Sequence, residues 1–365
     1  MPHVLLVRIA IMLGLWLSIS MLPQSTISLL PQTFAHTKSD LHVQRIKFPV
    51  TVLGEQHTIA GVLYVNPSQH KICSHKTTPR KVEKCFLKLS TLQVLVHGWT
   101  YNHTYWDPYG AGKPGRSYAR FMAKKGYVVL ALDLLGTGAS SVPDGAKLNF
   151  TENVNSLVQV LTPIRLQHHL QNNRIRHIAL VGHSGGTILS VLTAGTVPPL
   201  ADFLIATGWS YAPHQVFSRD IIDAALQQTP YIRFPSELRT ALFYYTPTAK
   251  PRRIAFDNNH LADQFPLGAL QEGLPLLTAL DEGRIDLINA VSLVDQVKVP
   301  VLVQLGDMDA IAKPLIPENE KTLYSGSPDV TIQVLENIGH SLNLHNDRKT
   351  GWRQINRWLK DQLFQ

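Results

Sequence analysis

Short apolar runs alternate with amphipathic stretches along most of the chain, and this pattern predicts the secondary structure. Strands buried on both faces of a parallel sheet read as nearly continuous apolar segments. Such segments are residues 92–96, 127–132, 177–181, 203–206, 299–305 and 330–335. Apolar residues recur at helical spacing in 117–125, 153–171, 187–195, 317–324 and 347–363. Because this β-α-β order requires parallel strands and right-handed crossovers, we predict an α/β fold with a doubly wound, mostly parallel sheet.

Two regions depart from this alternation. Residues 42–50 and 57–65 are β-rich runs on either side of a turn, which predicts an antiparallel hairpin at the start of the domain. Between residues 213 and 290 the chain has helix-like patches rich in aromatic residues, which predict a mainly helical lid insertion. A second packing layer with no role in access is the alternative. The expected domains are a first core part at 36–212, a lid at 213–290 and a second core part at 291–365.

The N-terminal segment has the layout of a secretory signal. Arg8 precedes an apolar run from residue 9 to residue 22, and the small residues Thr33 and Ala35 suit cleavage after Ala35. The run is shorter than the roughly 20 apolar residues that span a bilayer. We therefore expect residues 1–35 to be a signal peptide, and the mature protein to be secreted without a stable membrane anchor. An uncleaved anchor is the alternative.

Composition and charge favour a packed globular protein. Of the 365 residues 44% are hydrophobic and 16% charged, and the formal net charge is +8. About five of these positive charges lie in residues 71–88, where six Lys and Arg residues accompany one Glu. We interpret this segment as a solvated basic loop rather than an anion-binding site, because it lacks the features of a nucleic-acid recognition helix. Nucleic acid is not an expected partner.

Cys73 and Cys85 are the only two cysteines, and they lie within this basic segment. In an oxidising compartment they would close the segment as a disulfide. Closing so short a loop contributes about 3 kcal/mol in the chain-entropy model. Two separate free thiols are the alternative.

The residues at 182–186, Gly-His-Ser-Gly-Gly, lie between a predicted strand and a predicted helix. A Gly-x-Ser-x-Gly sequence in this context is typical of a strained turn that presents a nucleophilic serine. Glycines are needed beside the serine because side chains there would clash, and the helix N-terminus directs N–H groups toward developing negative charge. Ser184 is therefore the predicted nucleophile.

A serine nucleophile needs a histidine base, and that histidine needs a carboxylate to fix its tautomer. Asp307 and Asp309 follow the apolar run at 299–305, and His340 follows the last predicted strand. The resulting order of Ser, Asp and His is the one that the turn motif predicts. His340 is the predicted base, and His345 is the less favoured substitute. Strand alternation does not separate Asp307 from Asp309, because both side chains point the same way along an extended segment.

The stretch from about residue 42 to residue 363 resembles the α/β-hydrolase fold superfamily, in particular its serine esterases and lipases with a lid. Besides the turn at 182–186, three motifs carry the resemblance: Val-His-Gly-Trp at 96–99, Asp-Leu-Leu-Gly-Thr-Gly-Ala-Ser at 133–140 and Gly-Asp-Met-Asp at 306–309. The resemblance implies that the catalytic acid is the third residue after the glycine, which is Asp309.

The same resemblance implies how the site is completed. It assigns one oxyanion-binding N–H group to Trp99, and the second donor is the N–H of Gly185. It also implies that Asp133 braces the site. We expect His97 to fix the turn rather than to act as a base.

Aromatic side chains beyond two of the predicted strands are candidates for the substrate pocket. Core packing is the alternative interpretation for these residues. The candidates are Tyr105, Trp106, Trp209 and Tyr211.

Together these features predict a secreted serine hydrolase that needs no cofactor and cleaves small carboxylic esters or lactones of apolar substrates through an acyl-enzyme. An amidase or aminopeptidase is the nearest alternative, with Arg252 and Arg253 as candidates for a charged subsite. A non-catalytic binding protein on the same scaffold is another, and a polymer-degrading hydrolase with an open cleft is a third. No metal site is predicted, because His168 and His169 are neighbours on a predicted helix and face different ways.

Overall fold

The computed structural model describes residues 41–197, 200–312 and 317–364. The predicted signal peptide at residues 1–35 lies outside the described residues. Within the described ranges, no helix combines the length and the apolar character that a membrane span requires.

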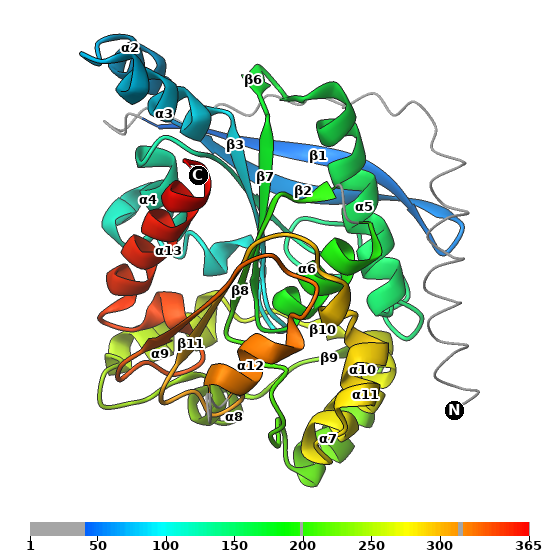
Figure 1. The fold of residues 1–365 in the computed structure, drawn as a ribbon. Helices are drawn as coiled ribbons and strands as arrows, with labels where there is room; N and C mark the ends of the chain where they lie inside the picture. The colour runs from blue at the N-terminus through cyan, green and yellow to red at the C-terminus, as the bar shows by residue number, and fades with distance from the viewer. Residues whose placement is uncertain (1–40, 198–199, 313–316, 365) are drawn as a thin grey trace.

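A sheet of eight strands forms the centre of the molecule (Figure 1). Its order is β1-β2-β4-β3-β7-β8-β11-β12, in which β1 and β2 form an antiparallel hairpin, β2 pairs antiparallel with β4, and the remaining neighbours are parallel. The strands are β1 (His42–Val52), β2 (Glu55–Val65), β3 (Thr91–Val96), β4 (Val128–Leu132), β7 (His177–His183), β8 (Phe203–Thr207), β11 (Val301–Gly306) and β12 (Val330–Leu335). The predicted α/β-hydrolase fold, with its mostly parallel sheet and N-terminal hairpin, is confirmed.

The apolar runs form the interior strands because both faces of the sheet are covered. Every residue of β3, β4, β8 and β11 is buried. The helices α4 (Tyr118–Lys124) and α13 (Arg348–Gln362) cover one face, and α5 (Phe150–Gln167) and α6 (Gly185–Thr196) cover the other (Figure 1). The helix α12 (Pro317–Leu323) packs against β12.

Local capping explains where two of these helices begin. The side chain of Ser117 accepts a hydrogen bond from the Arg120 N–H at the start of α4, and Asn149 accepts one from the Glu152 N–H at the start of α5. Short 3₁₀ helices complete the loops at η1 (His103–Tyr105), η2 (Gly110–Gly112), η3 (Pro114–Arg116), η5 (Val294–Gln296) and η6 (Leu342–Leu344).

The chain between β8 and β11 is mainly helical, as predicted, and lies at the carboxyl ends of the parallel strands, at the bottom of Figure 1. We call this part of the chain the cap. Its helices are α7 (Arg219–Leu226), α8 (Ser236–Phe243), α9 (Pro251–His260), α10 (Leu267–Asp281) and α11 (Ile285–Ser292). Two short strands, β9 (Tyr231–Ile232) and β10 (Phe265–Pro266), pair antiparallel inside it. The domain boundaries at residues 213 and 290 stay a prediction.

The basic segment differs from the predicted loop, because it folds into two helices, α2 (Gln69–Ser74) and α3 (Pro79–Leu89). The hydroxyl of Thr78 caps α3, and proline at its first position is already set at a helical φ. The predicted disulfide between Cys73 and Cys85 joins the two helices.

A second correction concerns the predicted helix at 153–171, which ends earlier. The helix α5 stops at Gln167, because His168 has a φ of +54°. A small antiparallel pair follows, made of β5 (His169–Leu170) and β6 (Asn173–Arg174). His168 and His169 are therefore not neighbours on a helix.

Candidate active site

Ser184 occupies a sharp turn between β7 and α6. Its φ of 53° and ψ of −123° lie in a region that non-glycine residues rarely adopt. The Ser184 N–H donates a 2.8 Å hydrogen bond to the carbonyl of Thr207 on the neighbouring strand, which fixes the turn. The side chain of Ser184 is half-buried at the carboxyl end of the sheet. The sequence motif therefore forms the strained strand-turn-helix geometry that it predicts.

Small residues around Ser184 allow this turn to approach the neighbouring strand. In the register of β3 with β7, Val96 pairs with Gly182, so Gly98 lies beside the turn. A Cβ atom on Gly98 would lie 2.9 Å from Ser184 Cβ, and one on Gly182 would lie 2.5 Å from Thr187 Cα. Both distances are shorter than real Cβ contacts, so any side chain at these positions would displace the turn.

The backbone N–H groups of Trp99 and Gly185 are the predicted oxyanion donors. Gly185 is the first residue of α6, so its N–H points out of the helix N-terminus. The indole of Trp99 lies over it, since a Cβ on Gly185 would be 2.6 Å from Trp99 Cδ1. Within the described ranges, neither N–H donates a hydrogen bond to another group. Their role in binding an oxyanion stays a prediction.

His340 is hydrogen-bonded to Asp309 and not to Asp307. Its Nδ1 lies 2.9 Å from Asp309 Oδ2 and 3.1 Å from Oδ1, and both side chains are buried. Asp309 Oδ1 also accepts the N–H groups of Ile311 and Ala312 at 2.8 and 2.9 Å. A carboxylate held in this way fixes the proton of His340 on Nδ1 and leaves Nε2 as the acceptor.

The two aspartates diverge because the chain turns after β11 instead of staying extended. The Asp309 N–H bonds back to the Gly306 carbonyl, which closes the turn. Asp307 is not hydrogen-bonded to His340; its Oδ1 instead accepts the Ile338 N–H at 3.2 Å. Strand alternation could not separate the two residues, because it assumes a straight segment.

The ring of His340 packs against His183, the residue that precedes Ser184. Its centroid is 5.0 Å from that of His183, and a Cβ on Gly208 would lie within 3.5 Å of both imidazole rings. No hydrogen bond joins Ser184 Oγ to His340 across the described ranges. Contacts of this kind often shorten only when substrate is bound.

Both ring nitrogens of His345, and both of His97, form hydrogen bonds with backbone groups. His345 Nε2 accepts the N–H groups of Gly339 and Tyr245 at 3.1 and 3.2 Å, so its proton is on Nδ1 and is donated to the Ser341 carbonyl. Burial lowers the pKa of His345 to about 4, which keeps it neutral. Neither nitrogen of His345 is free to serve as a base.

His97 fixes the turn that carries Gly98 and Trp99. Its Nδ1 donates to the Gly98 carbonyl at 2.9 Å, and its Nε2 accepts the Leu134 N–H at 3.0 Å. Burial lowers the pKa of His97, so the neutral ring stays in this role. The expectation from the sequence that His97 fixes a turn agrees with these contacts.

Sequence reasoning missed His183, the variable position inside the turn motif. It is fully buried, and the ring of Tyr105 stacks on it at 4.3 Å. Burial, followed by the neighbouring imidazoles of His340 and His97, lowers its pKa well below the ordinary value. A neutral ring therefore lies between His340 and Tyr105. His183 occupies the second position of the Gly-x-Ser-x-Gly motif, which accepts any residue, so the motif alone did not mark it.

Asp133 connects the loop at 133–140 to the chain beyond Trp99. Its Oδ1 accepts both the N–H and the Nδ1 of His103 at 2.7 Å, and its Oδ2 accepts the Ala139 N–H at 2.9 Å. Burial alone would raise the pKa of Asp133, but these hydrogen bonds and the charge of His103 lower it. The contacts fit a bracing role.

The four aromatic pocket candidates are all buried. Tyr105 stacks on His183, and Trp106 packs against Tyr118 with ring centroids 5.3 Å apart. Trp209 and Tyr211 pack edge to face at 6.2 Å. These contacts show that all four contribute to packing, and their role in substrate binding stays a prediction.

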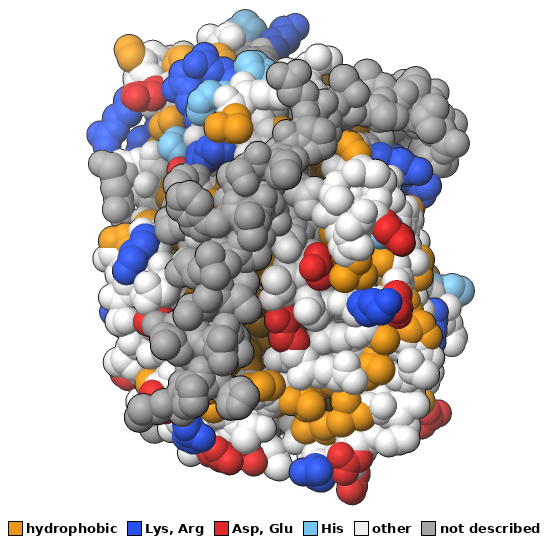
Figure 2. All heavy atoms as spheres, turned by 90° about the vertical axis from the view of Figure 1, so that its right-hand side faces the viewer, with side chains coloured by type: hydrophobic (Ala, Val, Ile, Leu, Met, Phe, Trp, Pro, Cys, Tyr) orange, Lys and Arg blue, Asp and Glu red, His pale blue; other side chains and the backbone are white. Residues whose placement is uncertain are grey.

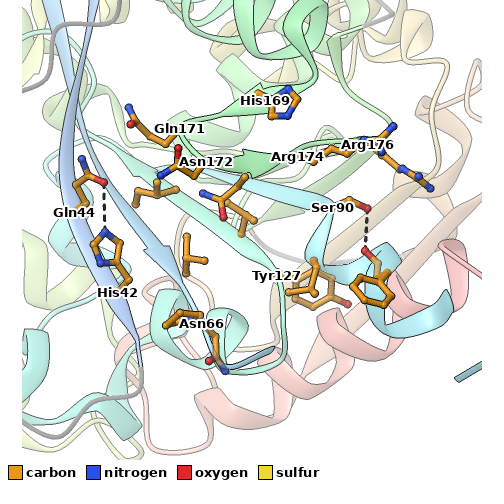
Figure 3. A pocket seen from close by; sticks show the side chains of 17 residues that line it. His42, Gln44, Asn66, Ser90, Tyr127, His169, Gln171, Asn172, Arg174 and Arg176 are labelled. Carbon is orange, nitrogen blue, oxygen red and sulfur yellow. Dashed lines mark hydrogen bonds between the residues drawn. The ribbon is translucent and has the colours of Figure 1, made fainter. Parts of the chain in front are cut away.

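Two cavities bear on where a ligand could lie. One of about 580 Å³ opens at the amino ends of β3, β4 and β7, lined by His42, Tyr127 and Arg174 among others (Figure 3). This cavity lies at the amino ends of the parallel strands, whereas Ser184 lies at their carboxyl ends. Another, of about 260 Å³, lies among α5, α6, α10 and α11, and Figure 2 shows hydrophobic side chains gathered on this side of the molecule. No group of three or more His, Cys, Asp and Glu residues in the described chain could hold a metal ion.

Solved structures with the same fold include three lipid- or ester-cleaving enzymes. A thermophilic esterase from Thermogutta terrifontis has a TM-score of 0.59 and 18% identity, covering 87% of this chain and 99% of that chain. A monoacylglycerol lipase from Paleococcus ferrophilus has a TM-score of 0.53 and 18% identity, covering 74% and 94%. A bacterial membrane phospholipase A has a TM-score of 0.52 and 16% identity, covering 87% and 86%. At these identities the likeness concerns the fold.

Sequence comparison supports the same grouping. No curated protein sequence is similar enough to count as a relative. Residues 93–349, however, match the alpha/beta hydrolase family, and this range includes most of β3, the turn at Ser184, the cap and the His340 loop. It covers more than half of the chain, and the resemblance stated from the motifs is confirmed. The chain therefore belongs to the alpha/beta hydrolase family.

Proposed function

We propose that this protein is a secreted serine hydrolase that cleaves carboxylic esters or lactones of apolar substrates. The observation that carries the proposal is the hydrogen-bonded pair of His340 and Asp309 at the same sheet edge as the strained turn of Ser184. A nucleophile, an acid and a base in this chain order are the arrangement with which the α/β-hydrolase fold carries out acyl transfer. The likeness to esterases and lipases supports ester hydrolysis as the reaction.

In the proposed reaction Ser184 Oγ attacks the ester carbonyl and its proton passes to His340 Nε2. Asp309 keeps the other ring proton on Nδ1 and stabilises the imidazolium that forms. The N–H groups of Trp99 and Gly185 bind the oxyanion. His340 then protonates the leaving alcohol, and water attacks the acyl-enzyme with the same histidine as base. An ester gives an alcohol and a carboxylic acid, and a lactone gives one hydroxy acid.

Apolar walls near the serine support an apolar substrate. The indole of Trp99 stacks on the rings of Phe265 and Phe150, at centroid distances of 4.5 and 5.8 Å. Phe150 also lines the cavity of about 260 Å³, together with Ile188, Leu276 and other mostly apolar side chains. Such a surface stabilises a hydrocarbon group by removing it from water.

The contacts of Arg253 do not support the aminopeptidase alternative. Its side chain is buried and donates to the Leu344 carbonyl at 2.6 Å and to Asn346 Oδ1 at 3.4 Å. A guanidinium engaged in this way holds the loop after His340 and is not free to bind a chain terminus. Arg252 is exposed and remains the weaker candidate for that subsite.

A fluorophosphonate probe and matched substrates test the proposal. We expect the probe to label the wild-type protein and not Ser184→Ala, and we expect nitrophenyl esters to be cleaved faster than the matching nitroanilides. Loss of the nucleophile should lower kcat by at least about a thousandfold. Circular dichroism controls for folding of the variant. Unlabelled, folded wild-type protein would favour the non-catalytic binding protein, and faster nitroanilide cleavage would favour the amidase.

Secretion is part of the proposal and has its own test. A disulfide between Cys73 and Cys85 fits an oxidising compartment, in line with the signal-like residues at 1–35. Expressed in a host with a secretory pathway, the protein should leave the cell with His36 as its first residue. N-terminal sequencing of the exported protein checks this, and retention of the intact chain in the cytosol would contradict it.

A further inference from the structure

A fully buried ion pair lies inside the cap. Arg239 on α8 and Asp257 on α9 are joined by a 2.9 Å contact between Nη2 and Oδ1, with side-chain exposures of 1% and 0%. Buried charges of this kind are stable only when hydrogen bonds satisfy their remaining atoms. Several hydrogen-bond partners of this pair belong to the sheet domain.

The pair reaches the loop after Trp99. Arg239 Nη1 donates to the Thr100 carbonyl at 2.9 Å and also to the Thr100 hydroxyl. Thr100 has a φ of +63°, which a β-branched residue rarely adopts. A guanidinium that bonds both oxygens of this residue stabilises the strained backbone directly after the oxyanion donor. The cap thus fixes one side of the candidate site.

The pair also reaches the loop of His340 through a tyrosine. Tyr101 donates its hydroxyl proton to Asp257 Oδ2 at 2.9 Å, and its oxygen lies 2.8 Å from Ser341 Oγ. A phenol has one proton, and a carboxylate paired with arginine only accepts, so the Ser341 hydroxyl must donate to Tyr101. The chain of donors therefore runs from Ser341 to Tyr101 to Asp257, and Ser341 directly follows His340 in sequence.

We propose that Tyr101 is a positioning residue that holds the His340 loop in register with the oxyanion turn, anchored by the Arg239–Asp257 pair of the cap. This inference rests on the proposed function, because it assigns Tyr101 a role in the reaction of Ser184 and His340. Tyr101 belongs to the segment that carries Trp99, so a single side chain connects both halves of the site. Positional errors of about 1 Å in such an arrangement can lower rates by about a hundredfold.

A second tyrosine provides a matched control. Tyr244 donates to the same oxygen of Asp257 at 2.8 Å, and it is buried like Tyr101. Among the described residues its hydroxyl contacts Asp257 alone, with no link to Ser341. Replacing either tyrosine with phenylalanine therefore removes the same bond to Asp257, and only Tyr101→Phe also cuts the link to the His340 loop.

The experiment compares Tyr101→Phe, Ser341→Ala, their double variant and Tyr244→Phe on a nitrophenyl ester. For Tyr101→Phe and Ser341→Ala we expect kcat to fall by about tenfold or more while KM stays within about twofold, because the lost contact orients the base and does not bind substrate. The double variant should be no slower than the slower single variant, since both cut one link. Tyr244→Phe should keep kcat within about twofold of wild type. Melting temperatures report the stability of each variant.

Ser341→Ala is the deciding variant if Tyr101→Phe does not fold. A kcat of Ser341→Ala within about twofold of wild type overturns the inference, and so does a kcat of Tyr244→Phe as low as that of Tyr101→Phe. Labelling of the wild type by a fluorophosphonate separates these outcomes from failure of the proposed function. If the folded wild-type protein is not labelled, the proposed function fails and this inference fails with it.

Discussion

The Nδ1 atom of His340 lies 2.9 Å from Oδ2 of Asp309, a residue 31 positions earlier in the chain. The turn after β11 directs Asp309 inward, whereas Asp307 bonds to the backbone of Ile338. The two residues are chemically identical and lie in one short turn, so comparing their variants isolates the contact with the histidine.

Asp309→Asn should lower kcat by about 10³–10⁴-fold, because an amide cannot hold the proton of His340 on Nδ1 or stabilise its cation. Asp307→Asn should stay within about threefold of wild type, because it leaves this contact intact. Steady-state hydrolysis of a nitrophenyl ester measures both. A greater loss in the Asp307 variant would assign the catalytic acid to that residue instead.

Gly98→Ala should slow labelling of Ser184 by about tenfold or more, because the added Cβ would lie 2.9 Å from Ser184 Cβ and 3.0 Å from the His183 carbonyl. Gly112→Ala is the control, since nothing lies within 4 Å of a Cβ at that position. The rate of fluorophosphonate labelling compares the two variants. Equal rates in wild type and Gly98→Ala would show that the turn tolerates the methyl group.

Glu320 should make the protein less stable as the pH rises. This buried side chain accepts three hydrogen bonds at 2.7 Å on one oxygen, from Ser210 Oγ and the N–H groups of Tyr211 and Ala212. Burial raises its pKa from 4.5 to about 7, against the effect of these bonds. Between these values the unfolded chain releases a proton that the folded chain keeps. The contribution of Glu320 to stability is therefore greatest below pH 4.5 and falls by up to about 3 kcal/mol toward pH 7.

Glu320→Gln removes this titration, so its stability relative to wild type should be greater at pH 8 than at pH 5. Urea unfolding at the two pH values measures the difference. Glu318→Gln, on the exposed side of the same helix, controls for the loss of a negative charge. A Glu320→Gln difference that stays constant with pH would contradict the prediction.

Removing the disulfide should destabilise the protein without impairing catalysis. The cysteines are 12 residues apart, and closing a loop of this size contributes about 3 kcal/mol. The helices α2 and α3 lie at the end of the sheet opposite the cap (Figure 1). For the variant with both Cys73→Ser and Cys85→Ser we therefore expect a lower melting temperature and an unchanged kcat. A loss of kcat in the folded variant would reveal a connection between the basic helices and the site.

The sheet could be predicted from the sequence because its strands are continuous apolar runs. The run predicted at 203–206 is the strand Phe203–Thr207, and that at 330–335 is the strand Val330–Leu335. The turn at Ser184 could be predicted because strand, motif and helix occur together in a local stretch. Where the fold depends on such local patterns, boundaries agree within a few residues.

The remaining features depend on contacts that no local pattern records. The hydroxyl of Tyr101 forms hydrogen bonds with Asp257 and Ser341, which lie 156 and 240 residues later in the sequence. The early end of α5 depends on one residue, His168, with a left-handed backbone. The basic segment looked like a loop because its charges are dense, while a Thr-Pro cap and a disulfide stabilise two short helices there.

The hydrogen bonds of Arg239 to Thr100 and of Tyr101 to Asp257 tie the cap to the sheet domain. Bonds to charged groups contribute about 1.5–3 kcal/mol each, and lifting α8 and α9 would break them together. These bonds therefore oppose a hinge motion of α8 and α9 away from the sheet domain. A cap held in this way has no closed conformation that an oil–water interface would open. The rate of hydrolysis of a sparingly soluble ester should therefore rise smoothly as its concentration passes the solubility limit, without a jump when droplets form.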